Sequence, residues 1–307
     1  PNQIVVSTGA KNSIYNVMQV LVDKGDEVLV PAPYWVSYVE IIKLAEGTPV
    51  IMPTSIETNY KITPEQLEKA ITPRTKAIIY SSPSNPTGAV YTREELKALA
   101  EVFARHPQVY IISDEIYEHI NFTPEGHTSI AEFPEVYEQT IVVNGLAKAY
   151  AMTGWRIGFI GAAQWIAKAC EDLQGQVTSG TNSVAQQAAV AALNADPEKM
   201  VKPMVEVFAR RRELVLKGLA EIPGFKTDTP YGAFYAFPDI SYYKGKTLGG
   251  HKINTSDDLC LYLLSEAHVG LVAGSSFGND DCIRLSYAAS EEVLTEALRR
   301  IKEALLK

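Results

Sequence analysis

The chain has 307 residues, of which 46% are hydrophobic and 21% are charged, and its formal net charge is −8 at pH 7. This length and apolar content allow a large buried core and predict about two domains. The acidic balance argues against binding to nucleic acid, whose backbone requires clustered Lys and Arg. No apolar run approaches the roughly 20 residues of a membrane helix. The first residues, Pro1–Gln3, show neither the basic region nor the apolar core of a signal peptide.

Short apolar segments alternate with helical patterns over the first two thirds of the chain. The predicted strands are residues 27–30, 48–52, 76–80, 109–113, 140–143 and 155–160. Their near-continuous apolar character predicts burial on both faces of a sheet. Helices are expected to begin at Thr63–Pro64, where Pro suits the first helical position, and at the capping box Thr92–Glu95. This alternation predicts an α/β fold with a mostly parallel central sheet flanked by helices.

From about Asp196 the pattern changes to a mixture of strands and helices, which is typical of a smaller α+β domain. In order, the expected elements are a long helix at 198–222, a strand at 232–237, a loop at 242–254, a helix from Ser256, strands at 269–272 and 282–287, and a last helix from Glu291. We place the domain boundary near residue 205. Residues 1–205 then form the large domain, and residues 206–307 form the small C-terminal domain.

The cysteines and histidines are scattered along the chain. Cys170, Cys260 and Cys282 are odd in number and far apart, which favours reduced thiols in the cytoplasm over a disulfide framework. The five histidines show no spacing typical of metal ligands. We therefore predict a cytoplasmic protein without a metal site.

Reactive residue types follow several of the predicted strands, and ligands bind at the carboxyl ends of strands in open α/β sheets. Gly9-Ala10-Lys11 precedes a helical stretch whose N-terminus can bind an anion, although many helices begin after a glycine. Asn85 lies in the segment 84–88, which by itself indicates an Asn-Pro turn. Asp114 and Tyr117 can converge on one planar ligand, and a helix N-cap is an equally good interpretation of the aspartate.

Lys148 follows the predicted strand at 140–143 and lies among small and apolar neighbours, with Arg156 eight residues further on. A lone lysine near a strand end is usually a surface residue. Desolvation and nearby positive charge lower the pKa of an amine, and a lysine that forms a Schiff base requires such a lowered pKa. Together with an acid, a phenol, an asparagine and an aromatic ring, Lys148 completes a set of groups suited to pyridoxal phosphate.

The joint pattern resembles the aspartate aminotransferase family of class I aminotransferases, which are pyridoxal-phosphate enzymes of fold type I. The matching segments run in order along essentially the whole chain at 9–11, 33–35, 84–88, 114–117, 148–156, 232–235 and 284–287. The lysine segment and the Asn-Pro-Thr-Gly segment are highly specific in combination. The pattern is similar to that of the bacterial subgroup that acts on aspartate and sometimes on prephenate.

This resemblance implies three catalytic residues. Lys148 carries pyridoxal 5′-phosphate as a Schiff base and moves the proton between the substrate and the cofactor. Asp114 pairs with the pyridine nitrogen and keeps it protonated. Tyr117 and Asn85 bond the phenolic oxygen of the ring.

The resemblance also assigns the remaining binding residues. Trp35 stacks on the cofactor ring, and the phosphate is bound by Arg156 and by the Gly9-Ala10-Lys11 turn. Arg284 holds the substrate α-carboxylate, and Trp35 and Asn85 border the same substrate. Lys11 can instead meet the side-chain carboxylate of an acidic substrate.

The activity that this family implies is a ping-pong transfer of an amino group between aspartate or glutamate and a 2-oxo acid, carried out by a homodimer. A pyridoxal-phosphate C–S lyase uses the same lysine, and a non-catalytic ligand-sensing domain is a third reading. Arg284 and Lys11 together favour transamination of a dicarboxylate. The lack of a DNA-binding segment in the sequence argues against the sensor.

Two departures from the family pattern stand out. Many relatives have a serine immediately before the lysine, or three residues before it, where this chain has Ala147 and Gly145. We therefore expect the phosphate to depend more on Arg156 and on the helix N-terminus. Family members also carry an N-terminal arm before the segment that matches Pro1. Either the chain is part of a longer protein, or it lacks that arm, in which case the pocket forms and turnover is impaired.

Overall fold

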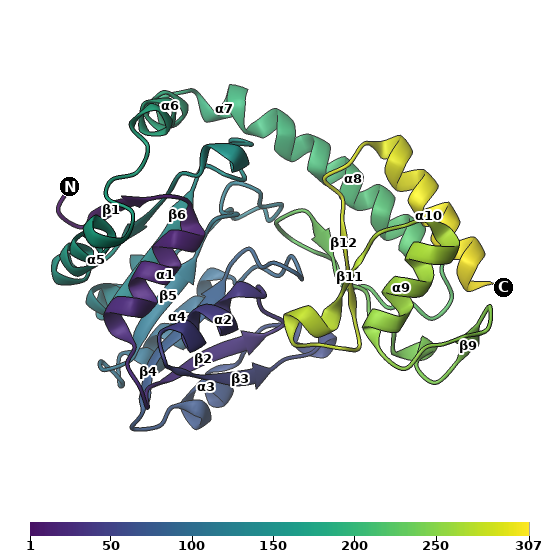
Figure 1. Ribbon diagram of the computed structural model, residues 1–307, viewed down its shortest axis with the longest axis horizontal. Helices are drawn as coiled ribbons and strands as arrows, with labels where there is room; N and C mark the ends of the chain where they lie inside the picture. The colour runs from purple at the N-terminus through teal and green to yellow at the C-terminus, as the bar shows by residue number, and fades with distance from the viewer. Residues whose placement is uncertain (307) are drawn as a thin grey trace.

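A seven-stranded sheet is the centre of the larger of two lobes in the computed structural model, which describes residues 1–306 (Figure 1). The strand order is β1-β7-β6-β5-β4-β2-β3. The strands are β1 (Ile4–Ser7), β2 (Glu27–Ala32), β3 (Thr48–Pro53), β4 (Thr75–Ser81), β5 (Tyr110–Asp114), β6 (Thr140–Gly145) and β7 (Gly158–Gly161). Only β7 pairs in antiparallel fashion with its neighbours, β1 and β6, so the predicted mostly parallel sheet is confirmed.

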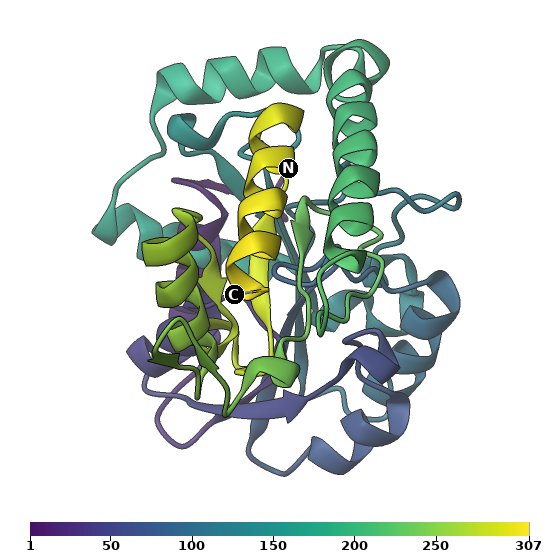
Figure 2. The same ribbon diagram turned by 90° about the vertical axis from the view of Figure 1, so that its right-hand side faces the viewer.

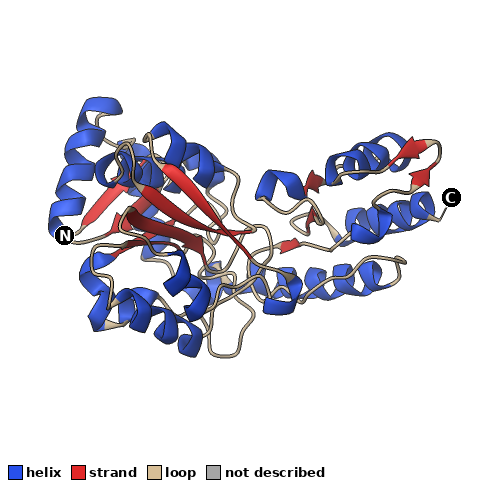
Figure 3. Cartoon of the chain, turned by 90° about the horizontal axis from the view of Figure 1, so that it is seen from below, coloured by secondary structure: helices blue, strands red, loops and turns tan. Residues whose placement is uncertain are grey.

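Helices cover both faces of this sheet (Figure 3). One face packs against α1 (Ala10–Leu21), α2 (Ser37–Leu44) and α5 (Gln164–Val177), and the other packs against α3 (Pro64–Ala70) and α4 (Arg93–Phe103). Alternate residues of one strand enter opposite cores, since Val28 and Val30 face α1 whereas Leu29 faces α4. Burial on both faces explains why these strands are apolar at nearly every position.

The smaller lobe is built from residues that follow α6 (Ser183–Leu193) and the short α7 (Pro197–Met200). Its elements are α8 (Lys202–Ala220), β8 (Tyr235–Ala236), β9 (Thr247–Leu248), β10 (His251–Lys252), α9 (Ser256–Ala267), β11 (Val272–Ala273), β12 (Ile283–Ser286) and α10 (Glu291–Leu305). Its antiparallel sheet has the order β11-β12-β8. Figure 2 shows α10 between α8 and α9, and these helices share one core with the sheet.

The predicted domain boundary at residue 205 lies near the start of α8, which continues without a break to Ala220 and leads from the larger lobe to the smaller one (Figure 1). The division at that residue stays a prediction. No helix within residues 1–306 is long and apolar enough to cross a membrane.

Several predicted element boundaries are wrong for local reasons. The strand expected at 155–160 begins only at Gly158, because Arg156 has a left-handed backbone (φ 55°) that no strand accommodates. The strand expected at 232–237 is reduced to Tyr235–Ala236, because Ala233 is also left-handed. The strand expected at 269–272 lies at Val272–Ala273 instead. The capping boxes expected at Thr63 and Thr92 are confirmed.

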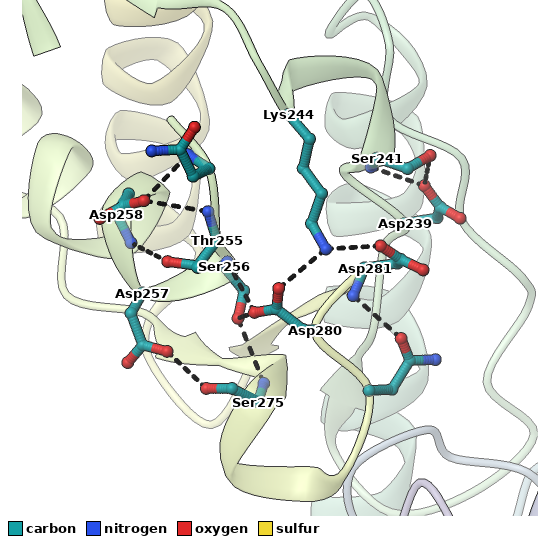
Figure 4. A network of polar contacts seen from close by, with 12 residues as sticks. Asp239, Ser241, Lys244, Thr255, Ser256, Asp257, Asp258, Ser275, Asp280 and Asp281 are labelled. Carbon is teal, nitrogen blue, oxygen red and sulfur yellow. Dashed lines mark hydrogen bonds and ion pairs between the residues drawn. The ribbon is translucent and has the colours of Figure 1, made fainter. Parts of the chain in front are cut away.

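A network of polar contacts holds the loop before β12 against the start of α9 (Figure 4). Lys244 Nζ donates to Asp280 at 2.8 Å and to Asp281 at 2.6 Å. The other oxygen of Asp280 accepts from the amide and the hydroxyl of Ser256 at 2.9 and 2.7 Å. The Ser256 hydroxyl also accepts from the amide of Ser275 at 3.1 Å, which ties the short 3-10 helix η6 (Gly274–Phe277) to the start of α9.

Candidate active site

Loops at the carboxyl ends of β2, β4, β5 and β6 surround a cavity of about 260 Å³. Its lining comprises Ala10, Lys11, Trp35, Tyr38, Ser81, Asn85, Asp114, Ile116, Tyr117, Ala147, Lys148, Thr153 and Arg156. Most of the site residues predicted from the sequence therefore meet at one place. Gly9 and Arg284 do not line the cavity, but each contacts a residue that does.

Lys148 lies in the turn after β6 and extends over aromatic rings. Its Nζ is 5.6 Å from the ring centre of Tyr117 and 5.8 Å from that of Phe234. Burial lowers the pKa of Lys148, and the positive charge of Arg284 lowers it further, while Asp114 acts in the opposite direction. A larger share of the amine is therefore neutral near pH 7 than in a free lysine, and the neutral amine is the nucleophilic form.

Asp114 ends β5 as a buried carboxylate, with only 4% of its surface exposed. The hydroxyl of Tyr38 donates to its Oδ2 at 2.6 Å, and the amide of Ile116 donates to its Oδ1 at 3.3 Å. Burial raises the pKa of Asp114 to about 6 even though both hydrogen bonds act to lower it. Within residues 1–306 no Lys, Arg or His forms an ion pair with Asp114. A cationic group in the cavity would form an ion pair with this carboxylate and stabilise its ionised form.

Tyr38 is a site residue that the sequence reasoning missed. It lies three residues after Trp35, and the two rings meet edge to face with their centres 5.5 Å apart. That spacing places both side chains on one side of a helical turn. The three-residue spacing could therefore have indicated that Tyr38 lies on the same side as Trp35. Its hydrogen bond to Asp114 could not be predicted in this way, because the two residues are 76 positions apart in the sequence.

The turn before α1 fits tightly against Arg156. Gly9 has a positive φ of 88°, and a Cβ atom there would collide with the guanidinium of Arg156. Ala10 and Lys11 are the first helical residues, so no helical carbonyl can reach their N–H groups. These two amides, which donate to no acceptor among residues 1–306, form with the helix dipole and one guanidinium a suitable site for a phosphate group.

Arg284 on β12 brings the smaller lobe to the cavity. Its Nη1 donates to Asn85 Oδ1 at 2.8 Å, across 199 residues of sequence. The guanidinium lies between two rings, 4.5 Å from the ring centre of Tyr235 and 4.8 Å from that of Phe277. Its Nε is buried and has no hydrogen-bond partner within the described residues. This arrangement fixes the plane of a side chain that can bind a carboxylate with two parallel hydrogen bonds.

Lys11 lies exposed beside the cavity, with its Nζ 4.9 Å from the ring centre of Trp35. Within residues 1–306 it forms no ion pair with a carboxylate. Its amine is thus placed to attract a negative group that enters over Trp35.

One cluster beside the cavity has the composition of a metal site. Ligand atoms of Glu115, Glu118 and His127 lie within 4.8 Å of one another. However, the buried carboxylate of Glu115 already accepts from the hydroxyls of Ser113 and Ser129 at 2.9 and 2.7 Å, and it contacts His127 at 2.9 Å. These bonds satisfy Glu115 without an ion, and the predicted lack of a metal site stays a prediction.

The family model for class I and II aminotransferases matches residues 1–301. The chain belongs to this family. It is 50% identical to a bifunctional aspartate aminotransferase and glutamate/aspartate-prephenate aminotransferase of Petunia hybrida, with all of this chain and 64% of that protein covered. It is 48% identical to an aspartate/prephenate aminotransferase of Cereibacter sphaeroides, with 98% of this chain and 76% of that protein covered.

A solved structure agrees with this family membership. The aspartate aminotransferase of Rhizobium meliloti superposes with a TM-score of 0.96 at 44% identity, covering 99% of this chain and 76% of that one. The predicted aminotransferase fold is confirmed, and the chain spans about two thirds to three quarters of the length of these family members.

Proposed function

We propose that this chain contains the active centre of an aspartate aminotransferase with pyridoxal 5′-phosphate as its cofactor. The activity is a ping-pong transfer of an amino group between aspartate or glutamate and a 2-oxo acid. The observation that carries the proposal is that Lys148 and Asp114 line one cavity and that Arg284 is hydrogen-bonded to Asn85 in its lining, in a chain of the class I and II aminotransferase family.

The residues at the cavity fit the cofactor. Asp114 is a buried carboxylate that forms no ion pair with any described residue and suits a protonated pyridine nitrogen, and the turn at Gly9 with Arg156 suits the phosphate. Asn85 and Tyr117 line the cavity and suit the ring oxygen. When bound, pyridoxal phosphate supplies an aldehyde for an amine and a ring that withdraws electrons from the substrate α-carbon.

Each side chain then has a defined action. The neutral amine of Lys148 would accept the proton from the substrate α-carbon, a role that its lowered pKa allows near neutral pH. Asp114 would hold a proton on the pyridine nitrogen of the cofactor, because an ionised carboxylate stabilises a neighbouring positive charge. Arg284 orients the α-carboxylate through its planar fork.

Aspartate is the proposed substrate because Lys11 adds a second positive group at the entrance to the cavity. The purified protein, loaded with pyridoxal phosphate, is expected to lose its visible absorbance on addition of L-aspartate and to regain it with 2-oxoglutarate. Replacement of Lys11 by alanine is expected to raise KM about tenfold for aspartate and to leave an aromatic substrate nearly unchanged, since one charge contact contributes on the order of 1–2 kcal/mol.

Four outcomes of this assay would contradict parts of the proposal. A protein that gains no visible absorbance with pyridoxal phosphate would refute the cofactor. Release of pyruvate and ammonia from a cysteine-type substrate would indicate a C–S lyase. Binding of an amino acid without any oxo-acid product would indicate a ligand sensor. Equal losses for aspartate and an aromatic substrate would restrict Lys11 to phosphate binding.

The phosphate site has its own test. Replacing Gly9 by alanine is expected to weaken pyridoxal phosphate binding at least about tenfold, because the new Cβ displaces Arg156 and the positive φ is strained. Gly25 is a matched control, because it also has a positive φ (97°) but a Cβ there meets no atom within 4 Å. Gly25→Ala therefore introduces backbone strain without a collision, and it is expected to leave cofactor binding unchanged. Fluorescence titration with the cofactor measures both variants, and equal affinities would contradict the assigned contact.

A homodimer is the proposed assembly. Exposed apolar side chains, Trp155 and Val184 among them, border a hollow beside Thr8 and Arg156. Apolar surface next to a polar site is typical of a protein interface. Analytical ultracentrifugation measures the mass, and a monomer at micromolar concentration would contradict this assembly. The cytoplasmic location stays a prediction.

A further inference from the structure

Two buried tyrosines from different lobes face each other beside the cavity. The hydroxyl of Tyr117, which follows β5, lies 2.9 Å from that of Tyr235 on β8. Only 3% of Tyr117 and 6% of Tyr235 is exposed, and their rings meet edge to face. Tyr117 lines the cavity, whereas Tyr235 does not and reaches it only through Tyr117. The pair therefore connects the cavity to the strand next to β12.

The direction of the hydrogen bond follows from counting protons. A phenol has one proton to donate and two lone pairs. Within residues 1–306 the Tyr235 hydroxyl has no hydrogen-bond partner except Tyr117. A buried hydroxyl without an acceptor costs about 1–3 kcal/mol. Donation from Tyr235 to Tyr117 satisfies Tyr235 and leaves the proton of Tyr117 for an acceptor in the cavity, whereas the opposite direction leaves Tyr235 unsatisfied.

The charges around the pair favour the same direction. The guanidinium of Arg284 lies 4.5 Å from the ring centre of Tyr235 and makes this phenol the stronger donor. Burial raises the pKa of Tyr235, while its bond with Tyr117 and the charge of Arg284 oppose that rise. Burial, Tyr235 and Asp114 all raise the pKa of Tyr117, and the opposing charge of Arg284 has the smallest effect of the four. In a pair of phenols the more acidic one donates.

We propose that Tyr235 is a positioning residue, whose hydroxyl donates to Tyr117 Oη and thereby directs the proton of Tyr117 into the cavity towards an acceptor atom of a bound ligand. The positive charge of Arg284 makes the Tyr235 hydroxyl a stronger hydrogen-bond donor. Only the identity of that ligand rests on the proposed function, because the direction of the hydrogen bond is a property of the protein itself.

Neutron diffraction of the deuterated protein without ligand tests the direction. The expected result is a deuterium on Tyr235 Oη that points at Tyr117 Oη. A deuterium on Tyr117 that points at Tyr235 would overturn the proposal. This experiment does not involve pyridoxal phosphate, so its result holds whether or not the proposed function is correct.

Tyr235→Phe tests the consequence, because phenylalanine keeps the ring that packs on Arg284. We expect pyridoxal phosphate to bind about three- to tenfold more weakly, the usual effect of one lost hydrogen bond. In a Tyr117→Phe background the same change is expected to have no further effect, because Tyr235 acts only through Tyr117. An equal loss in both backgrounds would overturn the proposal.

A control variant separates this role from a purely structural one. Tyr287 is also a buried tyrosine of the smaller lobe, but its hydroxyl donates to the carbonyl of Ala233 at 3.4 Å and lies outside the pair. Tyr287→Phe is expected to leave cofactor affinity unchanged. Melting temperatures measured without cofactor show whether each variant is folded, and equal losses of affinity for Tyr235→Phe and Tyr287→Phe would indicate a structural role alone.

Discussion

Replacing Lys148 by alanine is expected to lower kcat for amino transfer from L-aspartate by at least about four orders of magnitude. The variant loses both the amine that attacks the aldehyde and the base that moves the α-proton. Among residues 1–306, Lys11 is the only other lysine that lines the cavity, and its amine lies over Trp35. Single-turnover kinetics followed by absorbance measure the loss directly.

Two further variants define what the amine contributes. Lys148→Arg keeps the positive charge but cannot release a proton near neutral pH, so we expect it to be as inactive as the alanine variant. Lys97→Ala removes an exposed lysine of α4 and is expected to keep full activity. Activity of Lys148→Ala within tenfold of the unchanged protein would refute the assignment.

Much of the larger lobe was predictable because its strands can be recognised from their own residues. Buried parallel strands must be apolar at successive positions, and Val28, Leu29 and Val30 show this pattern since alternate residues enter opposite cores. Helix starts were predictable where a side chain caps them, as Thr63 and Thr92 do. Both signals depend only on residues that are close together in the sequence.

The failures arise where a single backbone conformation interrupts a pattern. Arg156 and Ala233 both adopt left-handed conformations inside segments whose composition is typical of strands. Such residues are uncommon outside glycine, and no local propensity predicts them. Arg156 lines the candidate cavity, so its unusual backbone conformation occurs at the site, where strained residues are often found.

The site was partly predictable for a different reason. Lys148, Asp114 and Asn85 were found because the family pattern marks them, and the cavity brings them together. Tyr38 and Tyr235 were not found, because their roles depend on contacts over 76 and 118 residues of sequence. Tyr235 belongs to a segment that matches the family, but only the three-dimensional structure shows that its hydroxyl faces Tyr117.

Asp114→Asn is expected to act in opposite directions on the empty and the loaded protein. Burial raises the pKa of Asp114 from its ordinary 3.8 to about 6 in the cofactor-free fold. Between about pH 4 and pH 6 the unfolded chain has released this proton while the folded chain keeps it, so stability falls as pH rises through this range. Two pKa units correspond to at most about 3 kcal/mol. Asparagine does not titrate, so the stability of the variant is expected not to fall between pH 4 and pH 6 for this reason.

With pyridoxal phosphate bound, the same substitution removes the negative charge that holds a proton on the pyridine nitrogen. We expect kcat/KM for aspartate to fall about a thousandfold, a typical loss for one group that stabilises charge in a transition state, and we expect the cofactor to bind more weakly. Thermal unfolding from pH 4 to pH 8, with and without cofactor, separates the two effects. Asp172→Asn is the control, because Asp172 is exposed on α5 and its loss leaves Asp114 in place. Full activity of Asp114→Asn would show that this carboxylate is not needed to keep the pyridine nitrogen protonated. An unchanged loss of stability between pH 4 and pH 6 would show that another group causes that loss.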